Sequence, residues 1–134
     1  MKQVGVGVDI AAPTEIVWDL IARFEHWPDW GTTISKVTVD HDIVASEVVA
    51  PGVVGRVRTI VGIWLPFEIT EVEPGRAWTW RVAGQRATGH SVMPLGASRS
   101  RLEFTVGWVL LPYLLPMWLA VRRIRALVEA KTEG

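Results

Sequence analysis

Apolar and polar residues alternate at the start of the chain, and this period of two predicts a strand with one buried face. The apolar positions are Val4, Val6, Val8 and Ile10. The next stretch, AAPTEIVWDLIARF, predicts a helix, because Pro13 stops the strand, Thr14 can cap a helix, and apolar residues then recur at helical spacing. The following EHWPDWG predicts a short helical turn that Pro28 interrupts and Gly31 closes.

Six further runs have the composition and alternation of strands. They are TISKVTVDHD, GRVRTIVG, PFEITEVE, AWTWRV, ATGHSVMP and SRLEFTVGWV. Several of the segments between them are as short as a hairpin loop, as in EPGR and AGQR. Neighbouring strands are therefore expected to be antiparallel.

The end of the chain predicts a long amphipathic helix over roughly residues 113–131, with Pro116 in its first turn. The preceding uncharged segment, Val106–Val121, has only 16 residues and contains two prolines. A membrane span needs about 20 residues. This segment is therefore interpreted as the end of a buried strand that leads into a buried helix, with no stable membrane insertion.

The order strand, helix, short helix, six strands and long helix predicts one α+β domain over residues 1–134. In the expected fold, a seven-stranded antiparallel sheet wraps around the long C-terminal helix, and two short helices lie between the first and second strands. A twisted sheet of this size has a concave face too deep for one helix to fill. The remaining volume is expected to be a pocket.

Composition narrows the function. Eight Trp residues accompany one Tyr and three Phe, which indicates either aromatic cavity walls or a Trp-rich core. The net charge is zero, so nothing points to nucleic acid. The chain has no Cys, and its first residues, MKQVGVGVDI, lack the apolar region of a signal peptide, so we expect a cytoplasmic protein.

The arrangement resembles the helix-grip superfamily, also called SRPBCC or START-like, and in particular its bacterial polyketide cyclase/dehydrase group. The pieces that carry the resemblance are DIAAPTEIVWDLIARFEHWPDW, FEITEVEPGRAWTWRV, GHSVMPLGASRSRLEF and the terminal helix. The resemblance implies the fold and an apolar ligand. It implies no catalytic residue, because members share none and only some are enzymes.

Alternation predicts which strand residues face the helix. In AWTWRV the inward residues are Trp78 and Trp80, and in RLEFTVGW they include Phe104 and Trp108. For ATGHSVMP the pattern allows two answers, with either the set Thr88, His90 and Val92 or the set Gly89, Ser91 and Met93 facing inward. Similar proteins carry larger apolar residues at the positions of His90 and Val92, which favours an inward His90.

These considerations predict a ligand site. The expected lining residues are Trp30, Trp64, Trp78, Trp80, Thr88, His90, Phe104, Trp108, Met117 and Trp118, with Trp30 and Trp64 nearest the mouth. Three roles are considered for His90: a structural histidine bonded to Thr88 or Tyr113, a polar anchor for a ligand, or an acid–base group, with His90 or Tyr113 moving a proton. We hypothesise that His90 is the main polar anchor of the pocket.

No metal or cofactor is expected. The only candidate ligand cluster, DHD at residues 40–42, has adjacent side chains that point to opposite faces of an extended chain. Gly5 and Gly7 do not open a phosphate-binding G-x-G-x-x-G loop.

The predicted function is binding of an apolar or aromatic, polyketide- or lipid-like molecule in an internal cavity. Whether the protein also promotes cyclisation or dehydration, or acts only as a carrier, stays open at this point. A more distant alternative is a protein or membrane interaction module that uses LLPYLLPMW. A homodimer is compatible with all three.

Overall fold

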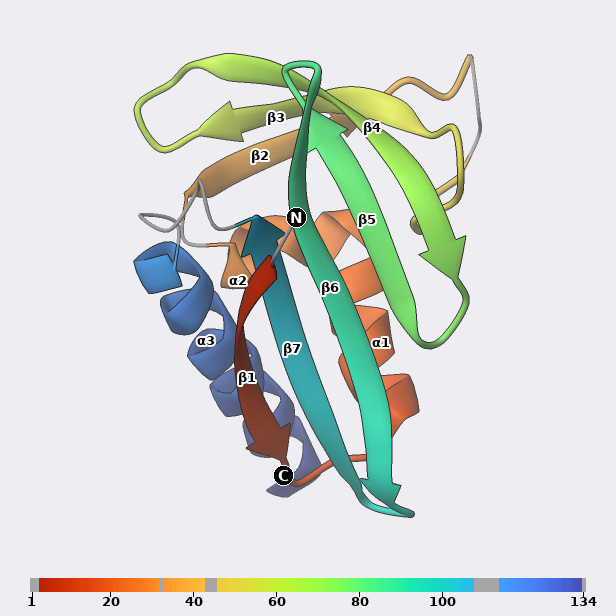
Figure 1. Cartoon of the computed structure of the whole chain (residues 1–134), viewed down its shortest axis with the longest axis vertical. Helices are drawn as coiled ribbons and strands as arrows, with labels where there is room; N and C mark the ends of the chain where they lie inside the picture. The colour runs from red at the N-terminus through yellow and green to blue at the C-terminus, as the bar shows by residue number, and fades with distance from the viewer. Residues whose placement is uncertain (1–2, 32, 43–45, 108–113, 134) are drawn as a thin grey trace.

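A computed structural model of the chain describes residues 3–31, 33–42, 46–107 and 114–133 (Figure 1). The elements are β1 (Gln3–Ile10), α1 (Thr14–Ala22), the 3₁₀ turn η1 (Phe24–His26), α2 (Trp27–Trp30), β2 (Ile34–Val39), β3 (Val54–Thr59), β4 (Trp64–Glu73), β5 (Ala77–Val82), β6 (Gln85–Gly96), β7 (Arg99–Gly107) and α3 (Leu114–Glu133). This order confirms the predicted one.

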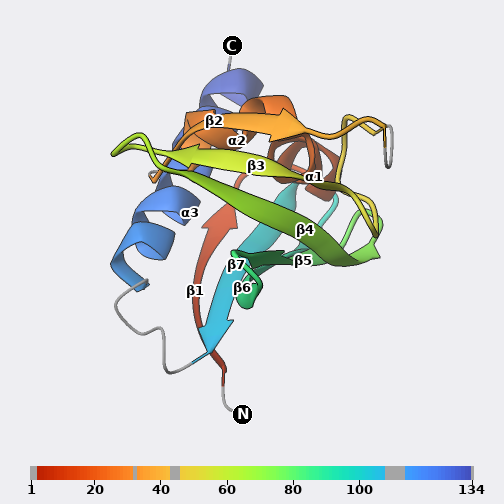
Figure 2. The same ribbon diagram turned by 90° about the horizontal axis from the view of Figure 1, so that it is seen from above.

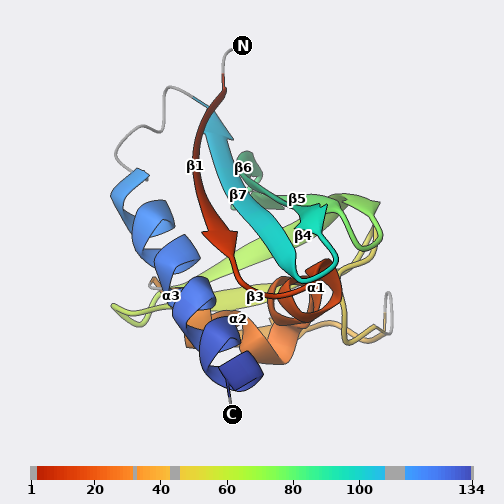
Figure 3. The same cartoon turned by 90° about the horizontal axis from the view of Figure 1, so that it is seen from below.

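The strands form one antiparallel sheet in the order β1-β7-β6-β5-β4-β3-β2. The sheet bends so strongly that β2, β3 and β4 cross the direction of β1 and β7, and α3 lies inside the bend (Figures 2 and 3). The helices α1 and α2 cover the adjacent end of the concave face. The predicted helix-grip fold is therefore confirmed.

The short helices are fixed by indole hydrogen bonds. The last carbonyl groups of α1 have no partner within the helix, as at every helix C-terminus. Trp27 Nε1 donates to the Ile21 carbonyl at 3.0 Å, and Trp30 Nε1 donates to the Leu20 carbonyl at 2.9 Å. The Trp-rich turn thus closes α1 and directs two large rings toward the sheet.

A tight turn and a register shift between β5 and β6 together set the orientation of β6. Both turn residues have positive φ angles, 52° at Ala83 and 80° at Gly84, as expected for a two-residue hairpin loop. The turn alone would place His90 opposite Ala77, but the pairing shifts by one residue at a β-bulge between Thr79 and Arg81. His90 therefore pairs with Trp78 on one side and with Phe104 on the other. His90 and Val92 are buried, whereas Met93 is 49% exposed. The inward alternative for His90 is therefore the correct one.

The inner face of α3 packs against the sheet. Its buried residues are Ala120, Val121, Ile124 and Val128. Within the described ranges, no helix is long and apolar enough to cross a membrane. The uncharged segment examined above overlaps residues 108–113, which lie outside those ranges.

Candidate functional site

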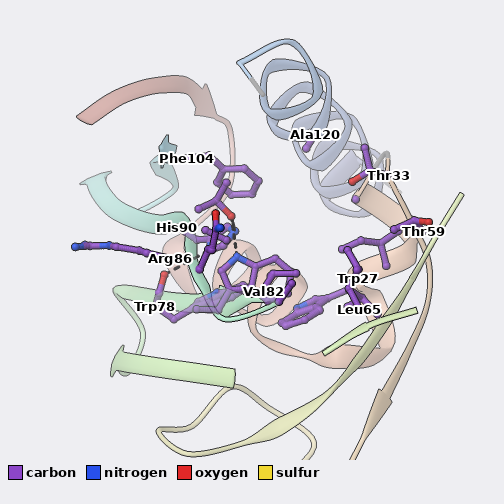
Figure 4. Close-up of a pocket in the computed structure, with 18 of the residues that line it drawn as sticks. Trp27, Thr33, Thr59, Leu65, Trp78, Val82, Arg86, His90, Phe104 and Ala120 are labelled. Carbon is purple, nitrogen blue, oxygen red and sulfur yellow. Dashed lines mark hydrogen bonds between the residues drawn. The ribbon is translucent and has the colours of Figure 1, made fainter. Parts of the chain in front are cut away.

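A cavity of about 480 Å³ lies between the concave face of the sheet and α3 (Figure 4). This volume is within the range of small-molecule sites. The lining residues come from α2, the segment after it, every strand from β2 to β7, and α3. They are Trp27, Trp30, Gly31, Thr33, Ile34, Val57, Thr59, Leu65, Trp78, Trp80, Val82, Ala83, Gln85, Arg86, Ala87, Thr88, His90, Phe104 and Ala120.

One wall of the cavity is a stack of three rings. The Trp78 indole stacks with two other rings. Its centroid lies 5.0 Å from that of Trp27 and 3.8 Å from that of His90. Phe104 meets the His90 ring edge-on at 4.6 Å, and Trp80 meets Trp78 edge-on at 5.7 Å. All five side chains are buried. Such a packed aromatic wall is rigid and offers flat apolar surface to a ligand.

A chain of hydrogen bonds crosses this wall. Trp80 Nε1 donates to Thr88 Oγ1 at 2.9 Å, and Thr88 Oγ1 lies 3.0 Å from His90 Nε2. His90 Nδ1 lies 3.3 Å from the Trp78 carbonyl oxygen. Because a carbonyl only accepts, the Nδ1 atom carries the proton, and Nε2 accepts from the Thr88 hydroxyl. Both ring nitrogens of His90 are therefore satisfied by the protein.

Burial keeps His90 neutral. Removal from water disfavours the charged ring and lowers the pKa of His90 to about 3, although the bond to the Trp78 carbonyl acts in the opposite direction. Among the described residues that line the cavity, none has a carboxylate side chain. A protonated imidazole would therefore have no counter-ion there.

The described residues direct no charge into the cavity. Apart from His90, which is neutral, Arg86 is the only described lining residue with an ionisable side chain, and this side chain extends away from the cavity (Figure 4). In the described part of the chain, no group of three His, Cys, Asp or Glu residues is arranged to hold a metal ion.

The structure brings six of the predicted site residues together on the cavity wall. They are Trp30, Trp78, Trp80, Thr88, His90 and Phe104. Trp108 and Tyr113 lie outside the described residues, as does the side chain of Met117 in α3.

The prediction that Trp64 and Trp118 line the cavity is wrong, because neither residue is among those that line it. In β4 the inward residues are Leu65 and Phe67, so Trp64 points to the convex face, where it pairs with Arg58 and is 42% exposed. Trp118 is 45% exposed. The helix is rotated so that Ala120 faces the cavity instead (Figure 4).

Sequence reasoning missed several lining residues. For Trp27 the sequence predicts only a short helical turn, because helical periodicity does not indicate which way the side chains of a four-residue helix point. Val57 and Thr59 alternate along β3, and this alternation could have indicated their common face. Ala120 gave no signal, since a small residue on a long apolar stripe looks like any other core position.

Three comparisons place the chain among known proteins. A family model described as "Polyketide cyclase / dehydrase and lipid transport" matches residues 1–129. A search of curated protein sequences found no significant match.

Solved structures share the fold at low sequence identity. The Zhui aromatase/cyclase from Streptomyces sp. R1128 is similar, with 16% identity, a TM-score of 0.71, and 98% of this chain and 95% of that chain covered. A norcoclaurine synthase from Thalictrum flavum has 14% identity, a TM-score of 0.62, and coverage of 98% and 96%. The Aha1 protein from Colwellia psychrerythraea, solved as a dimer, has 12% identity, a TM-score of 0.70, and coverage of 96% and 97%.

The structural likeness supports the fold, and the match over nearly the whole sequence settles the family. The chain belongs to the polyketide cyclase/dehydrase and lipid transport family.

Proposed function

We propose that this protein binds an uncharged apolar or aromatic small molecule, of polyketide-like or lipid-like skeleton, in the cavity between the sheet and α3. The observation that carries the proposal is a 480 Å³ cavity with aromatic walls and no charged group directed into it. A charged ligand would lose its hydration there without gaining a counter-ion. An apolar ring system instead gains contact with Trp27, Trp78 and Phe104.

Binding is tested by titration with naphthalene-sized aromatic compounds, followed by intrinsic Trp fluorescence and calorimetry. The four tryptophans that line the cavity, Trp27, Trp30, Trp78 and Trp80, should report saturable quenching. Two variants should remove binding by filling the cavity from opposite sides, Ala120→Phe from α3 and Leu65→Trp from β4. Both residues line the cavity in Figure 4.

The matched control is Leu119→Phe. Leu119 neighbours Ala120 on α3 but is 43% exposed, so the added ring meets solvent. Binding should survive in this variant. If either cavity-filling protein keeps its melting temperature and still binds as tightly as the wild type, the proposed site is wrong.

Catalysis of cyclisation or dehydration is the second candidate. The Thr88 hydroxyl lies 3.0 Å from His90 Nε2, which is within the range of proton transfer. The low pKa of His90 makes it a weak base, however, and no carboxylate in the lining would stabilise its charged form. We therefore rank binding without catalysis first. Turnover of a poly-β-carbonyl thioester that His90→Phe abolishes, with ligand affinity kept, would reverse this order.

Tyr113, the expected proton-transfer partner, lies outside the described residues, and so do residues 110–113 of the LLPYLLPMW segment on which the interaction alternative depends. A homodimer is measured by light scattering coupled to size exclusion. A mass of twice 14.9 kDa would support it.

A further inference from the structure

We infer that the ligand carries a hydrogen-bond donor, a phenol, enol or alcohol O–H on its apolar skeleton, and that Thr88 Oγ1 accepts that bond. This inference rests on the proposed function, and it narrows the ligand class. It follows from the direction in which protons run along the hydrogen-bond chain in the aromatic wall.

The two ends of this chain fix its direction. The indole N–H of Trp80 can only donate, and the Trp78 carbonyl can only accept. Between them, His90 is neutral and has one proton, which the carbonyl places on Nδ1. The Thr88 hydroxyl must then donate its own proton to His90 Nε2. Every N–H and O–H donor of this hydrogen-bond chain therefore already has an acceptor.

One bonding position remains open. A hydroxyl oxygen has two lone pairs, and in the described part of the chain only the Trp80 indole donates to the Thr88 oxygen, so that it occupies one of the two. Thr88 is half-buried and lines the cavity. The polar spot on the aromatic wall therefore accepts hydrogen bonds and does not donate them.

The other tautomer of His90 would favour a ligand with a hydrogen-bond acceptor instead of a donor. With its proton on Nε2, His90 would donate to Thr88, and the freed hydroxyl could bind a ligand carbonyl. That arrangement sets the Nδ1 lone pair against the Trp78 carbonyl oxygen at 3.3 Å, where two acceptors repel each other. The buried strand pairing of Trp78 with His90 holds those two atoms in place.

The other polar groups near the cavity do not change the preference of the Thr88 site for a ligand that donates a hydrogen bond. Trp78 Nε1 has no partner among the described residues, but the atom is fully buried and offers no donor to the cavity. Thr33 and Gln85 are exposed and therefore belong to the solvent side of the lining. The Thr59 hydroxyl accepts from the Ile63 backbone N–H, and Thr59 lies across the cavity from His90 and thus away from the polar spot at Thr88 (Figure 4).

A matched ligand series tests the inference on the wild-type protein by calorimetry. The series is 2-naphthol, 2-methoxynaphthalene, 2-acetonaphthone and naphthalene, which share one ring system and differ in hydrogen bonding. 2-Naphthol should bind about five- to tenfold more tightly than the methyl ether, the worth of one neutral hydrogen bond. Equal affinities, or tighter binding of the ketone, would overturn the inference and leave the proposed function standing. If none of the four binds, the proposed function fails first.

Variants at Thr88 assign the effect to one oxygen. Thr88→Val keeps the shape of the side chain and puts a methyl group where the hydroxyl stood, so the preference for 2-naphthol over its ether should disappear. Thr88→Ser keeps the hydroxyl and should keep the preference. Melting temperatures show that both variants are folded. A naphthol preference that persists in folded Thr88→Val would place the acceptor elsewhere.

Nitrogen-15 NMR of the ligand-free protein decides the proton direction without any ligand. The His90 ring should show a protonated Nδ1 and an unprotonated Nε2 at pH 7. A protonated Nε2 would overturn the inference even if 2-naphthol binds well. Because this measurement needs no ligand, its outcome is independent of the proposed function.

Discussion

Two sets of tryptophans occupy opposite sides of the same fold. The inner set consists of Trp27, Trp30, Trp78 and Trp80, each at most 8% exposed, and the outer set consists of Trp64 and Trp118, each more than 40% exposed. In the inner set, Trp27 stacks on Trp78 and Trp80 meets Trp78 edge-on, and all four inner rings line the cavity. In the outer set, the Arg122 guanidinium lies 4.9 Å above the Trp118 ring, and Trp64 pairs with Arg58 across the strands.

The difference shows that residue type alone does not make a binding wall. Three of the four inner indoles donate their N–H to a protein acceptor, which frees their faces for apolar contact. Trp64 belongs to the same sheet, but it lies one residue out of phase with Leu65 on the concave face. A single step along a strand therefore separates a candidate ligand contact from a surface residue.

The largest difference between the two sets should appear in stability. Trp27→Ala removes a fully buried ring from the centre of the aromatic wall and should lower the free energy of unfolding by about 3–5 kcal/mol. Trp64→Ala should lower it by only about 0.5–1 kcal/mol, because the ring is already partly in water. Urea denaturation measures both. Similar losses in the two variants would erase the distinction.

A second effect is the pH dependence that comes from the inner wall. The pKa of His90 is about 3 in the folded protein and about 6.5 when exposed, so the unfolded chain takes up the proton first as pH falls. The contribution of neutral, buried His90 to the free energy of unfolding is fully present above pH 6.5 and is lost progressively toward pH 3. Between pH 7 and pH 5 the free energy of unfolding should fall by about 2 kcal/mol.

The control for this effect is His90→Phe, which has no titrating ring. The variant should be less stable at pH 7, because the Thr88 hydroxyl and the Trp78 carbonyl lose a partner. The free energy of unfolding should, however, fall by about 2 kcal/mol less between pH 7 and pH 5 than in the wild type. An unchanged pH dependence would assign the effect to other groups.

A finer test separates two members of the inner set by their indole N–H groups. Trp27→Phe leaves the Ile21 carbonyl at the end of α1 without its partner, whereas Trp78→Phe removes an N–H that has no partner among the described residues. Both lose similar ring area. Trp27→Phe should therefore be the more destabilising by about 1–2 kcal/mol in chemical denaturation. The reverse order would show that packing outweighs the hydrogen bond.

The smallest expected effect concerns the outer set. Stacking of the Arg122 guanidinium on Trp118 should contribute about 0.5–1 kcal/mol at this exposed site. A double-mutant cycle with Trp118→Leu and Arg122→Gln measures this coupling, and ligand affinity should stay unchanged in all three variants. A loss of affinity in Trp118→Leu would return Trp118 to the candidate ligand site from which the geometry removes it.

Local patterns along the chain predict the architecture. Period-two alternation, helical periodicity and short turns are local properties, and together they predicted the order of elements and the single domain. Alternation also identified Trp78, Trp80 and Phe104 as inward residues, since each lies on a strand whose two faces differ clearly in polarity. For these positions, burial of apolar area leaves only one orientation.

The lining of the cavity depends on contacts between residues that are distant in sequence. Both faces of ATGHSVMP have mixed polarity, so the inward position of His90 depends on the register shift between Thr79 and Arg81 and on pairing with two neighbouring strands. The rotation of α3, which brings Ala120 to the cavity, depends on how the helix packs inside the bent sheet. The proton direction through Thr88 and His90 depends on a carbonyl that is distant in sequence. Long-range pairing sets all three features, and local periodicity carries no information about it.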